Sequence, residues 1–267
     1  MSEPLLVLDN ITKSYGAVQA LRGVSFSIGK GEVIALLGDN GAGKSTLVKI
    51  ISGGLDASSG SMRFEGKPFA PKSPSEAKAA GIETVYQDLS LCTNVDVVAN
   101  FFMGRELTRS FLGIKVLDEP RMEEQVAKAM ATAGTRIPSL RSKVEHLSGG
   151  QRQAIELNRF VHWGGKLVLL DEPFAALGVE QTKRGLEMIR QVAAQGIGVV
   201  IITHIMQQAF QVADRMVVIR QGVVAGDVPT KQTNADAVIG MITGETLTGT
   251  GPVGGVTEGS GAQERNE

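Results

Sequence analysis

The chain has 267 residues, of which 42% are hydrophobic and 21% are charged, a composition typical of a soluble globular protein. Its 27 basic and 28 acidic side chains leave a net charge of −1, which argues against a general nucleic-acid binder, since such a protein needs surplus positive charge. Aromatic side chains make up only 4%, so a surface for stacking bases is not expected either.

The start of the chain predicts a small antiparallel sheet. The first ten residues, MSEPLLVLDN, have neither the basic start nor the long apolar stretch of a secretory signal. The stretches LLVLDNITKSYG and VSFSIGKGEV then alternate apolar with polar residues and contain turn signals. We therefore expect an N-terminal antiparallel β subdomain.

Residues 38–46, GDNGAGKST, have the pattern of a phosphate-binding loop between the strand EVIALL and the helical run LVKIISG. Its glycines let the backbone turn tightly and direct N–H groups at phosphates, and a helix that begins near Lys44 directs its positive end at the same anion. We expect Lys44 to reach the β- and γ-phosphates and Ser45 to bind Mg²⁺. The other residues predicted to bind nucleotide here are Gly38, Asp39, Asn40, Gly41, Ala42, Gly43 and Thr46.

Between about residues 90 and 162 the pattern becomes helical, as in RMEEQVAKAMATAG. We predict an inserted α-helical subdomain that splits an α/β core. The single cysteine, Cys92, lies in this region, cannot form an internal disulfide, and has no metal-ligand spacing around it. We interpret it as a small buried hydrophobe.

Residues 147–151, LSGGQ, approach a helix near the end of this insertion. Ser148, Gly149 and Gly150 place small groups and bare N–H groups at the helix start, which is a ready anion site. Because the phosphate-binding loop already serves the nucleotide of this chain, we expect the second site, together with Gln151, to serve the nucleotide of another chain.

Four runs are almost entirely apolar and predict the strands of a mostly parallel sheet covered by helices. They are Val33 to Leu37, Leu167 to Leu170, Val199 to Thr203 and Met216 to Ile219. None approaches the roughly 18 residues that a membrane span needs. We expect a cytosolic protein whose membrane role depends on a partner.

Two carboxylates follow the second of these runs, in LVLLDE at residues 167–172. We predict that Asp171 holds the Mg²⁺ shell and that Glu172 polarises the attacking water, since general-base assistance contributes roughly 10²–10⁴-fold in rate. The last residues, 243–267, are rich in Gly and Thr with little to bury, and we expect a disordered tail after a domain at 1–242.

GDNGAGKST, LSGGQRQ and LVLLDEP, in this order, resemble the ABC ATPase family over about residues 5–242. The resemblance implies a P-loop NTPase core and three further roles. Tyr15 is similar to an aromatic residue that stacks on adenine, Gln87 to a glutamine that reaches Mg²⁺ and the water while sensing the transporter, and His204 to a histidine that contacts the γ-phosphate. The simpler alternatives are a Tyr15 that covers the small sheet, a solvated Gln87 and a structural His204.

The chain departs from the family pattern after the carboxylates. Residues 175–178 read AALG where S/T-x-L-D is usual, so Gly178 lacks the carboxylate that helps to couple the two sites of a dimer. Some relatives that import sugars tolerate this change, so it does not predict an inactive enzyme. Phe174 replaces a common Thr.

A finer resemblance, to bacterial importer ATPases for ribose, xylose and fructose, lies in APKSPSEAKAAGIETVYQDLSL, NFFMGREL, LDEPRMEEQVAKAM and ITHIMQQAFQVADRMVVIRQG. A single ATPase domain is typical of the fructose-type branch. The alternatives are an ABC ATPase for another cargo such as an amino acid or lipid, a non-transport ABC protein, and a silent nucleotide-binding regulator.

The resemblance also implies the assembly. A homodimer would enclose two ATP molecules, each between the phosphate-binding loop of one chain and the LSGGQ of the other. Membrane permease subunits would bind a groove near Gln87 and residues 88–105, on the cytoplasmic face of the bacterial inner membrane. A periplasmic sugar-binding protein would take part indirectly, the cargo would be a pentose or fructose, and no nucleic acid would be bound.

Overall fold

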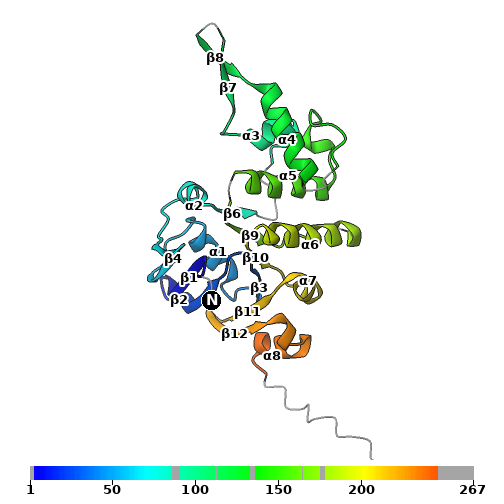
Figure 1. Ribbon diagram of the computed structural model, residues 1–267. Helices are drawn as coiled ribbons and strands as arrows, with labels where there is room; N and C mark the ends of the chain where they lie inside the picture. The colour runs from blue at the N-terminus through cyan, green and yellow to red at the C-terminus, as the bar shows by residue number, and fades with distance from the viewer. Residues whose placement is uncertain are drawn as a thin grey trace, which may run out of the picture.

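The computed structural model describes residues 3–85, 91–111, 113–132, 136–163, 165–174 and 178–245. The predictions for Gln87 and for residues 246–267 of the tail therefore lie outside the described residues. Figure 1 shows a body of two sheets with helices, and a smaller group of elements, from α3 to α5, that extends from it. No helix in these described ranges has the length and apolar character needed to cross a membrane.

The N-terminal sheet is antiparallel, as predicted, with the strand order β2-β1-β4-β5. Its strands are β1 (Leu6–Tyr15), β2 (Val18–Ile28), β4 (Ser59–Phe64) and β5 (Lys67–Pro68). Alternate residues of β1, among them Leu6 and Leu8, are buried, since successive side chains of a strand face opposite sides.

The central sheet has the order β12-β11-β3-β10-β9-β6 and is parallel except for its last strand, β12, which runs antiparallel to β11. Its strands are β3 (Val33–Leu37), β6 (Ile82–Val85), β9 (Leu167–Asp171), β10 (Gly198–Ile202), β11 (Arg215–Arg220) and β12 (Val223–Pro229). Every residue of β3 and β10 is buried, as the apolar runs predicted. The carboxyl ends of β3, β10 and β9 meet at one edge, which is where ligands bind in open α/β sheets.

Helices cover the central sheet on two sides. They are α1 (Lys44–Ile51), α2 (Pro74–Ala80), α6 (Val179–Ala194), α7 (Met206–Val212) and α8 (Ala235–Thr243), with a 3-10 turn η2 (Thr230–Gln232). One apolar cluster joins the two sheets to α1, and a second joins the central sheet to α6 and α7. Helix α8 includes Thr243, the first residue of the predicted tail.

The insertion has an apolar core of its own, around Phe101, Phe102, Val126 and Ile155. Its elements are α3 (Val97–Phe102), β7 (Thr108–Phe111), β8 (Ile114–Leu117), α4 (Glu119–Thr132), the 3-10 turn η1 (Val144–His146) and α5 (Gly149–His162). The helical prediction missed the antiparallel hairpin β7–β8, because two strands of four residues are too short to interrupt a helical pattern visibly.

Arg159 links the insertion to the central sheet. The residue is 9% exposed; its guanidinium donates from Nη1 to the Asn100 carbonyl oxygen of α3 at 3.2 Å and lies 3.7 Å from Glu83 Oε1 of β6. Asn100 in turn accepts at Oδ1 from the Cys92 N–H at 2.7 Å. Cys92 itself is exposed, so the prediction of a buried hydrophobe is wrong: the backbone at this position is held by Asn100, while the residue faces solvent with its Sγ 3.7 Å from Met103 Sδ.

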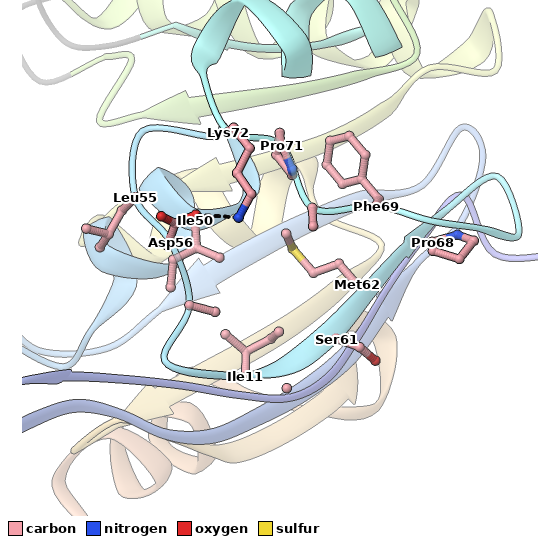
Figure 2. A pocket seen from close by; sticks show the side chains of 13 residues that line it. Ile11, Ile50, Leu55, Asp56, Ser61, Met62, Pro68, Phe69, Pro71 and Lys72 are labelled. Carbon is pink, nitrogen blue, oxygen red and sulfur yellow. Dashed lines mark hydrogen bonds and ion pairs between the residues drawn. The ribbon is translucent and has the colours of Figure 1, made fainter.

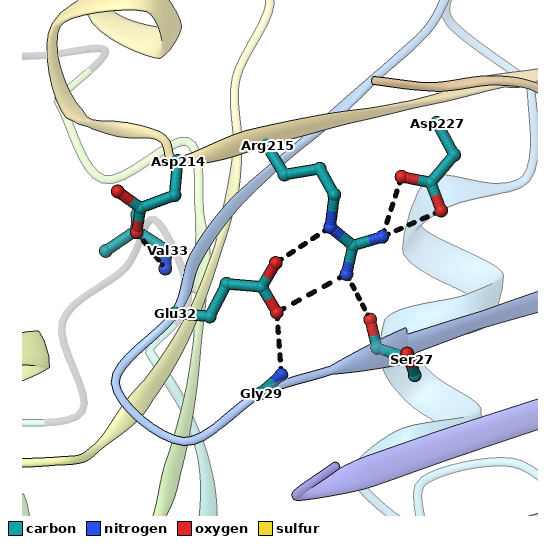
Figure 3. Close-up of polar contacts among 7 residues, drawn as sticks. All are labelled: Ser27, Gly29, Glu32, Val33, Asp214, Arg215 and Asp227. Carbon is teal, nitrogen blue, oxygen red and sulfur yellow. Dashed lines mark hydrogen bonds and ion pairs between the residues drawn. The ribbon is translucent and has the colours of Figure 1, made fainter. Parts of the chain in front are cut away.

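A second polar network connects the two sheets at the amino end of β3, where Glu32 precedes the strand (Figure 3). Arg215 Nε donates to Glu32 Oε1 at 2.7 Å and Nη1 donates to Asp227 Oδ1 at 2.6 Å, while Nη2 donates to the Ser27 carbonyl oxygen of β2. Because one guanidinium serves β2, β11 and β12, this network fixes the N-terminal sheet relative to the central one.

Candidate functional site

The loop between β3 and α1 has a conformation that only glycine accommodates at two positions. Gly38 has φ 144° and a Cβ there would overlap the Ile219 carbonyl oxygen. Gly43 has φ 111°, and its Cβ would lie 2.7 Å from the Ala20 carbonyl oxygen. Gly43 also caps α1, and as a glycine it offers no side-chain hydrogen bond to the first N–H groups of that helix.

The Lys44 ammonium lies across this loop. Its Nζ donates to the Gly38 carbonyl oxygen at 2.6 Å and to the Asp39 carbonyl oxygen at 2.8 Å. Burial lowers the pKa of Lys44, although the nearby charges of Glu172, Asp39 and Asp171 act in the opposite direction. A partly buried cation next to uncapped N–H groups is a favourable place for a phosphate anion.

Asp171 and Glu172 lie where β9 ends, beside the loop. Glu172 has φ 47°, a left-handed conformation that costs energy for a residue with a Cβ, and its N–H donates to the Ile202 carbonyl oxygen of β10 at 2.9 Å. Burial raises the pKa of Asp171, as does the charge of Glu172, while Lys44 and Lys49 lower it. The turn therefore places two carboxylates side by side at the sheet edge.

His204 follows β10, and its Nδ1 lies 2.8 Å from Glu172 Oε1. The turn that carries it is fixed by Thr203, whose buried hydroxyl accepts from the Ile205 N–H at 3.1 Å and donates to Gln208 Oε1 at 3.2 Å. No sequence motif assigns a role to Thr203 or Gln208, and only their place beside His204 indicates their role.

A cavity of about 230 Å³ lies between the loop and the carboxylates. The described residues that line it are Ala20, Asn40, Gly41, Gly43, Lys44, Ser45, Thr46, Asp171, Glu172 and Ile202. The structure thus brings the predicted loop and the predicted carboxylates together, and it adds Ala20 and Ile202, which carry no sequence signal. Neither Tyr15 nor the stretch 148–151 is among the described lining residues.

Another cavity, of about 270 Å³, lies between the N-terminal sheet and α1 (Figure 2). Its walls are mainly apolar, with Ile11, Met62 and Phe69 among them, and Lys72 Nζ lies 3.3 Å from Asp56 Oδ1 at its edge. It lacks a glycine loop that directs N–H groups inward, so the cavity beside Lys44 is the better candidate for an anionic ligand.

Tyr15 ends β1 with half of its side chain exposed, and Lys13 Nζ lies 5.4 Å from the centre of its ring. Ser148 caps α5: its Oγ accepts from the Gln151 N–H at 3.3 Å, and Gln151 Oε1 accepts from the Ser148 N–H at 3.0 Å. This reciprocal capping box orders the first turn of α5 and leaves the glycines between the two residues without side chains over their N–H groups.

The two departures from the family pattern have structural settings. Phe174 is 2% exposed and packs on Gly185 of α6, where a Cβ would lie 3.0 Å from Cζ of the ring. Gly178 is the N-cap residue of α6 with φ −71°, and because it has no side chain it cannot accept a hydrogen bond from the first turn as an Asp side chain would. A carboxylate is therefore absent from a helix start where the backbone conformation would accept an Asp.

The chain is similar in sequence to known transporter proteins. A family model described as ABC transporter matches residues 21–175. The chain is 44% identical over 239 residues to the xylose/arabinose import ATP-binding protein XylG of Sulfolobus acidocaldarius, covering 90% of this chain and 94% of that protein. It is 43% identical over 224 residues to the fructose import ATP-binding protein FrcA of Rhizobium meliloti, covering 82% and 86%.

Solved structures agree on the fold. The ADP conformation of an ATP-binding cassette of an ABC transporter superposes with a TM-score of 0.76 at 27% identity, covering 91% of this chain and all of the other. A dimeric structure of a bacterial ABC transporter cassette superposes with a TM-score of 0.68 at 22% identity, covering 84% and 98%. The second likeness is one of fold alone.

Proposed function

The chain belongs to the ABC transporter family, and we propose that it is the ATP-hydrolysing subunit of a bacterial importer of monosaccharides of the pentose or fructose type. The observation that carries the proposal is the Glu172–His204 pair beside the cavity of the phosphate-binding loop. The xylose/arabinose and fructose import proteins support the cargo class, because the alignment covers most of this chain and of each of them.

ATP is the nucleotide of the family, and the oxygen donors of the cavity fit magnesium as its companion. The described residues contain no group of three His, Cys, Asp or Glu side chains that could hold a metal ion. Mg²⁺, however, commonly uses one carboxylate and a hydroxyl together with substrate phosphates, and the cavity offers Asp171 and Ser45. We propose that these two residues, with Gln87, hold Mg²⁺, which would neutralise developing charge on the phosphates.

The residues around the cavity would have different roles in ATP hydrolysis. The loop N–H groups and Lys44 bind and orient the phosphates, and Glu172 accepts a proton from the attacking water. His204, held by Thr203 and hydrogen-bonded to Glu172, keeps that carboxylate in place and turns toward the γ-phosphate. Tyr15 would cover the adenine, which would lie farther out than the phosphates, so this role does not require Tyr15 to line the cavity.

We propose that a second copy of the chain completes each site. Ser148 and Gln151 form a capping box that orders the helix start and leaves the N–H groups of Gly149 and Gly150 without side chains over them, and none of the four residues lines the cavity of its own chain among the described residues. In a head-to-tail homodimer they would bind the γ-phosphate held by the partner.

The proposed function also requires partner proteins and a position at the membrane. A permease would supply the path through the membrane, a periplasmic sugar-binding protein would deliver the cargo to it, and this chain would lie on the cytoplasmic face. The domain at 1–242 and the permease groove near Gln87 and residues 88–105 belong to the same proposal. An importer of amino acids or lipids would use the same nucleotide chemistry, so the cargo needs its own test.

Uptake by proteoliposomes that contain the cognate permease tests the proposal. We expect labelled xylose, arabinose or fructose to accumulate with ATP on the side of this chain, and accumulation to stop with Lys44→Ala. Uptake of an amino acid instead would overturn the cargo assignment, and sugar uptake that persists with Lys44→Ala would overturn the role of this chain as the driving subunit.

A further inference from the structure

The hairpin β7–β8 presents large apolar side chains to solvent at its tip. Phe111 and Ile114, which face each other across the two strands beside the turn, are 60% and 68% exposed. Leu117, which pairs with Thr108 at the base of the hairpin, is 50% exposed. Figure 1 shows the hairpin at the end of the insertion that lies farthest from the central sheet. Among the described residues of the insertion, most large apolar side chains are buried in its own core, and Met103, at 45%, is the one exposed large apolar side chain outside the hairpin.

The charges around the tip are all positive. The ten residues from 108 to 117, TRSFLGIKVL, contain Arg109 and Lys115 and no acidic residue. Arg109 lies opposite Val116, and Lys115 lies opposite Ser110, so the two cations project from opposite faces of the hairpin, both exposed. The acidic groups at its base have partners: Glu106 accepts from the Gly104 N–H at 3.0 Å and Asp118 from the Arg121 N–H at 3.4 Å.

An apolar tip between two cations suits the surface of an anionic bilayer. The apolar side chains can enter the boundary between headgroups and acyl chains, while the cations stay at the level of the lipid phosphates. A protein partner is the weaker fit, because a stable protein interface buries about 800 Å² on each side and a tip of two short strands offers much less.

We infer that the tip of this hairpin inserts into the headgroup region of an anionic membrane. The chain then contacts lipid directly, in addition to any contact with a permease. This inference rests on the proposed function in one respect only, which is that the proposed function places the chain next to a membrane. In a homodimer two hairpins would act together, so that individually weak contacts combine into a stronger one.

Cosedimentation of the full chain with vesicles tests the inference. We expect binding to phosphatidylcholine vesicles that contain phosphatidylglycerol, weaker binding at high salt, and little binding to phosphatidylcholine alone. The double variants Phe111→Ser/Ile114→Ser and Arg109→Glu/Lys115→Glu should each bind at least about tenfold more weakly. Ile239→Ser and Lys231→Glu, which change an exposed apolar residue and an exposed cation far along the chain, should bind like the parent.

The rate of MgATP hydrolysis, measured on the same samples, shows that the variants are folded and keeps the two proposals separate. Equal vesicle binding by the parent and both double variants would overturn the lipid contact. So would the absence of binding to anionic vesicles, or binding that appears only when a permease is embedded in them. Failure of sugar uptake with normal vesicle binding would instead overturn the proposed function and leave the lipid contact standing.

Discussion

His204 Nδ1 lies 2.8 Å from Glu172 Oε1, and these two residues come from turns that follow neighbouring parallel strands. The contact depends on the left-handed conformation of Glu172, whose N–H is held by the Ile202 carbonyl oxygen of β10. The same strand end thus fixes the backbone of the carboxylate and carries the imidazole that contacts its side chain. Glu172 Oε2 and His204 Nε2 take no part in this contact and can bind other groups.

The turn around Thr203 should matter for catalysis although Thr203 is not among the described residues that line the cavity. Thr203→Val removes the hydroxyl that binds the Ile205 N–H and Gln208, so we expect the free energy of unfolding to fall by about 1–3 kcal/mol. We also expect kcat to fall about tenfold with little change in KM, since His204 loses its fixed position. Thr203→Ser keeps the hydroxyl and should restore both quantities. A kcat for Thr203→Val equal to that of the parent would contradict a positioning role.

The contact between Phe174 and Gly185 predicts an unusual response to a helix substitution. Gly→Ala within a helix commonly stabilises a protein by about 0.4–1 kcal/mol. Here the added methyl group would overlap the buried ring, so Gly185→Ala should instead lower the free energy of unfolding by about 1–3 kcal/mol in urea titrations. Combining it with Phe174→Leu should recover part of the loss, whereas a stabilising Gly185→Ala would show that the ring does not occupy this position.

Gly178 offers a way to test coupling between the two proposed sites. Gly178→Asp places a carboxylate at the cap of α6 and should change stability by only a few tenths of a kcal/mol, since Gly is itself an acceptable cap. We expect the dependence of hydrolysis on ATP concentration to become more sigmoidal. An unchanged Hill coefficient would mean that the missing carboxylate does not limit coupling in this protein.

The loop and the strand ends were predictable because their signals are local. Glycine spacing specifies the backbone of residues 38–46, and apolar runs locate the strands that bring the loop beside Asp171 and Glu172. The contact of Phe174 with Gly185 was not predictable, because it depends on how α6 packs after a turn. The hairpin was missed because its strands are short, and Cys92 was assigned wrongly because burial depends on tertiary surroundings. The role of Gln87 stays a prediction, since that residue lies outside the described ranges.

The proposed dimer predicts a change in mass with nucleotide. Glu172→Gln should bind MgATP without rapid hydrolysis, and light scattering should then give about twice the mass found without nucleotide. The control is Glu172→Gln combined with Lys44→Ala, which should stay monomeric because the phosphates lose their cation. A chain that binds MgATP and remains a monomer at high protein concentration would contradict a dimer formed by this chain alone.

The most direct test of the account is the rate of MgATP hydrolysis by Glu172→Gln, beside the control Glu187→Gln on the exposed face of α6. If Glu172 accepts the proton of the attacking water, the rate should fall roughly 10²–10⁴-fold while ATP affinity is retained, and the control should hydrolyse like the parent. Hydrolysis by Glu172→Gln at a rate near that of the parent would contradict the assignment of this carboxylate as the base of the site.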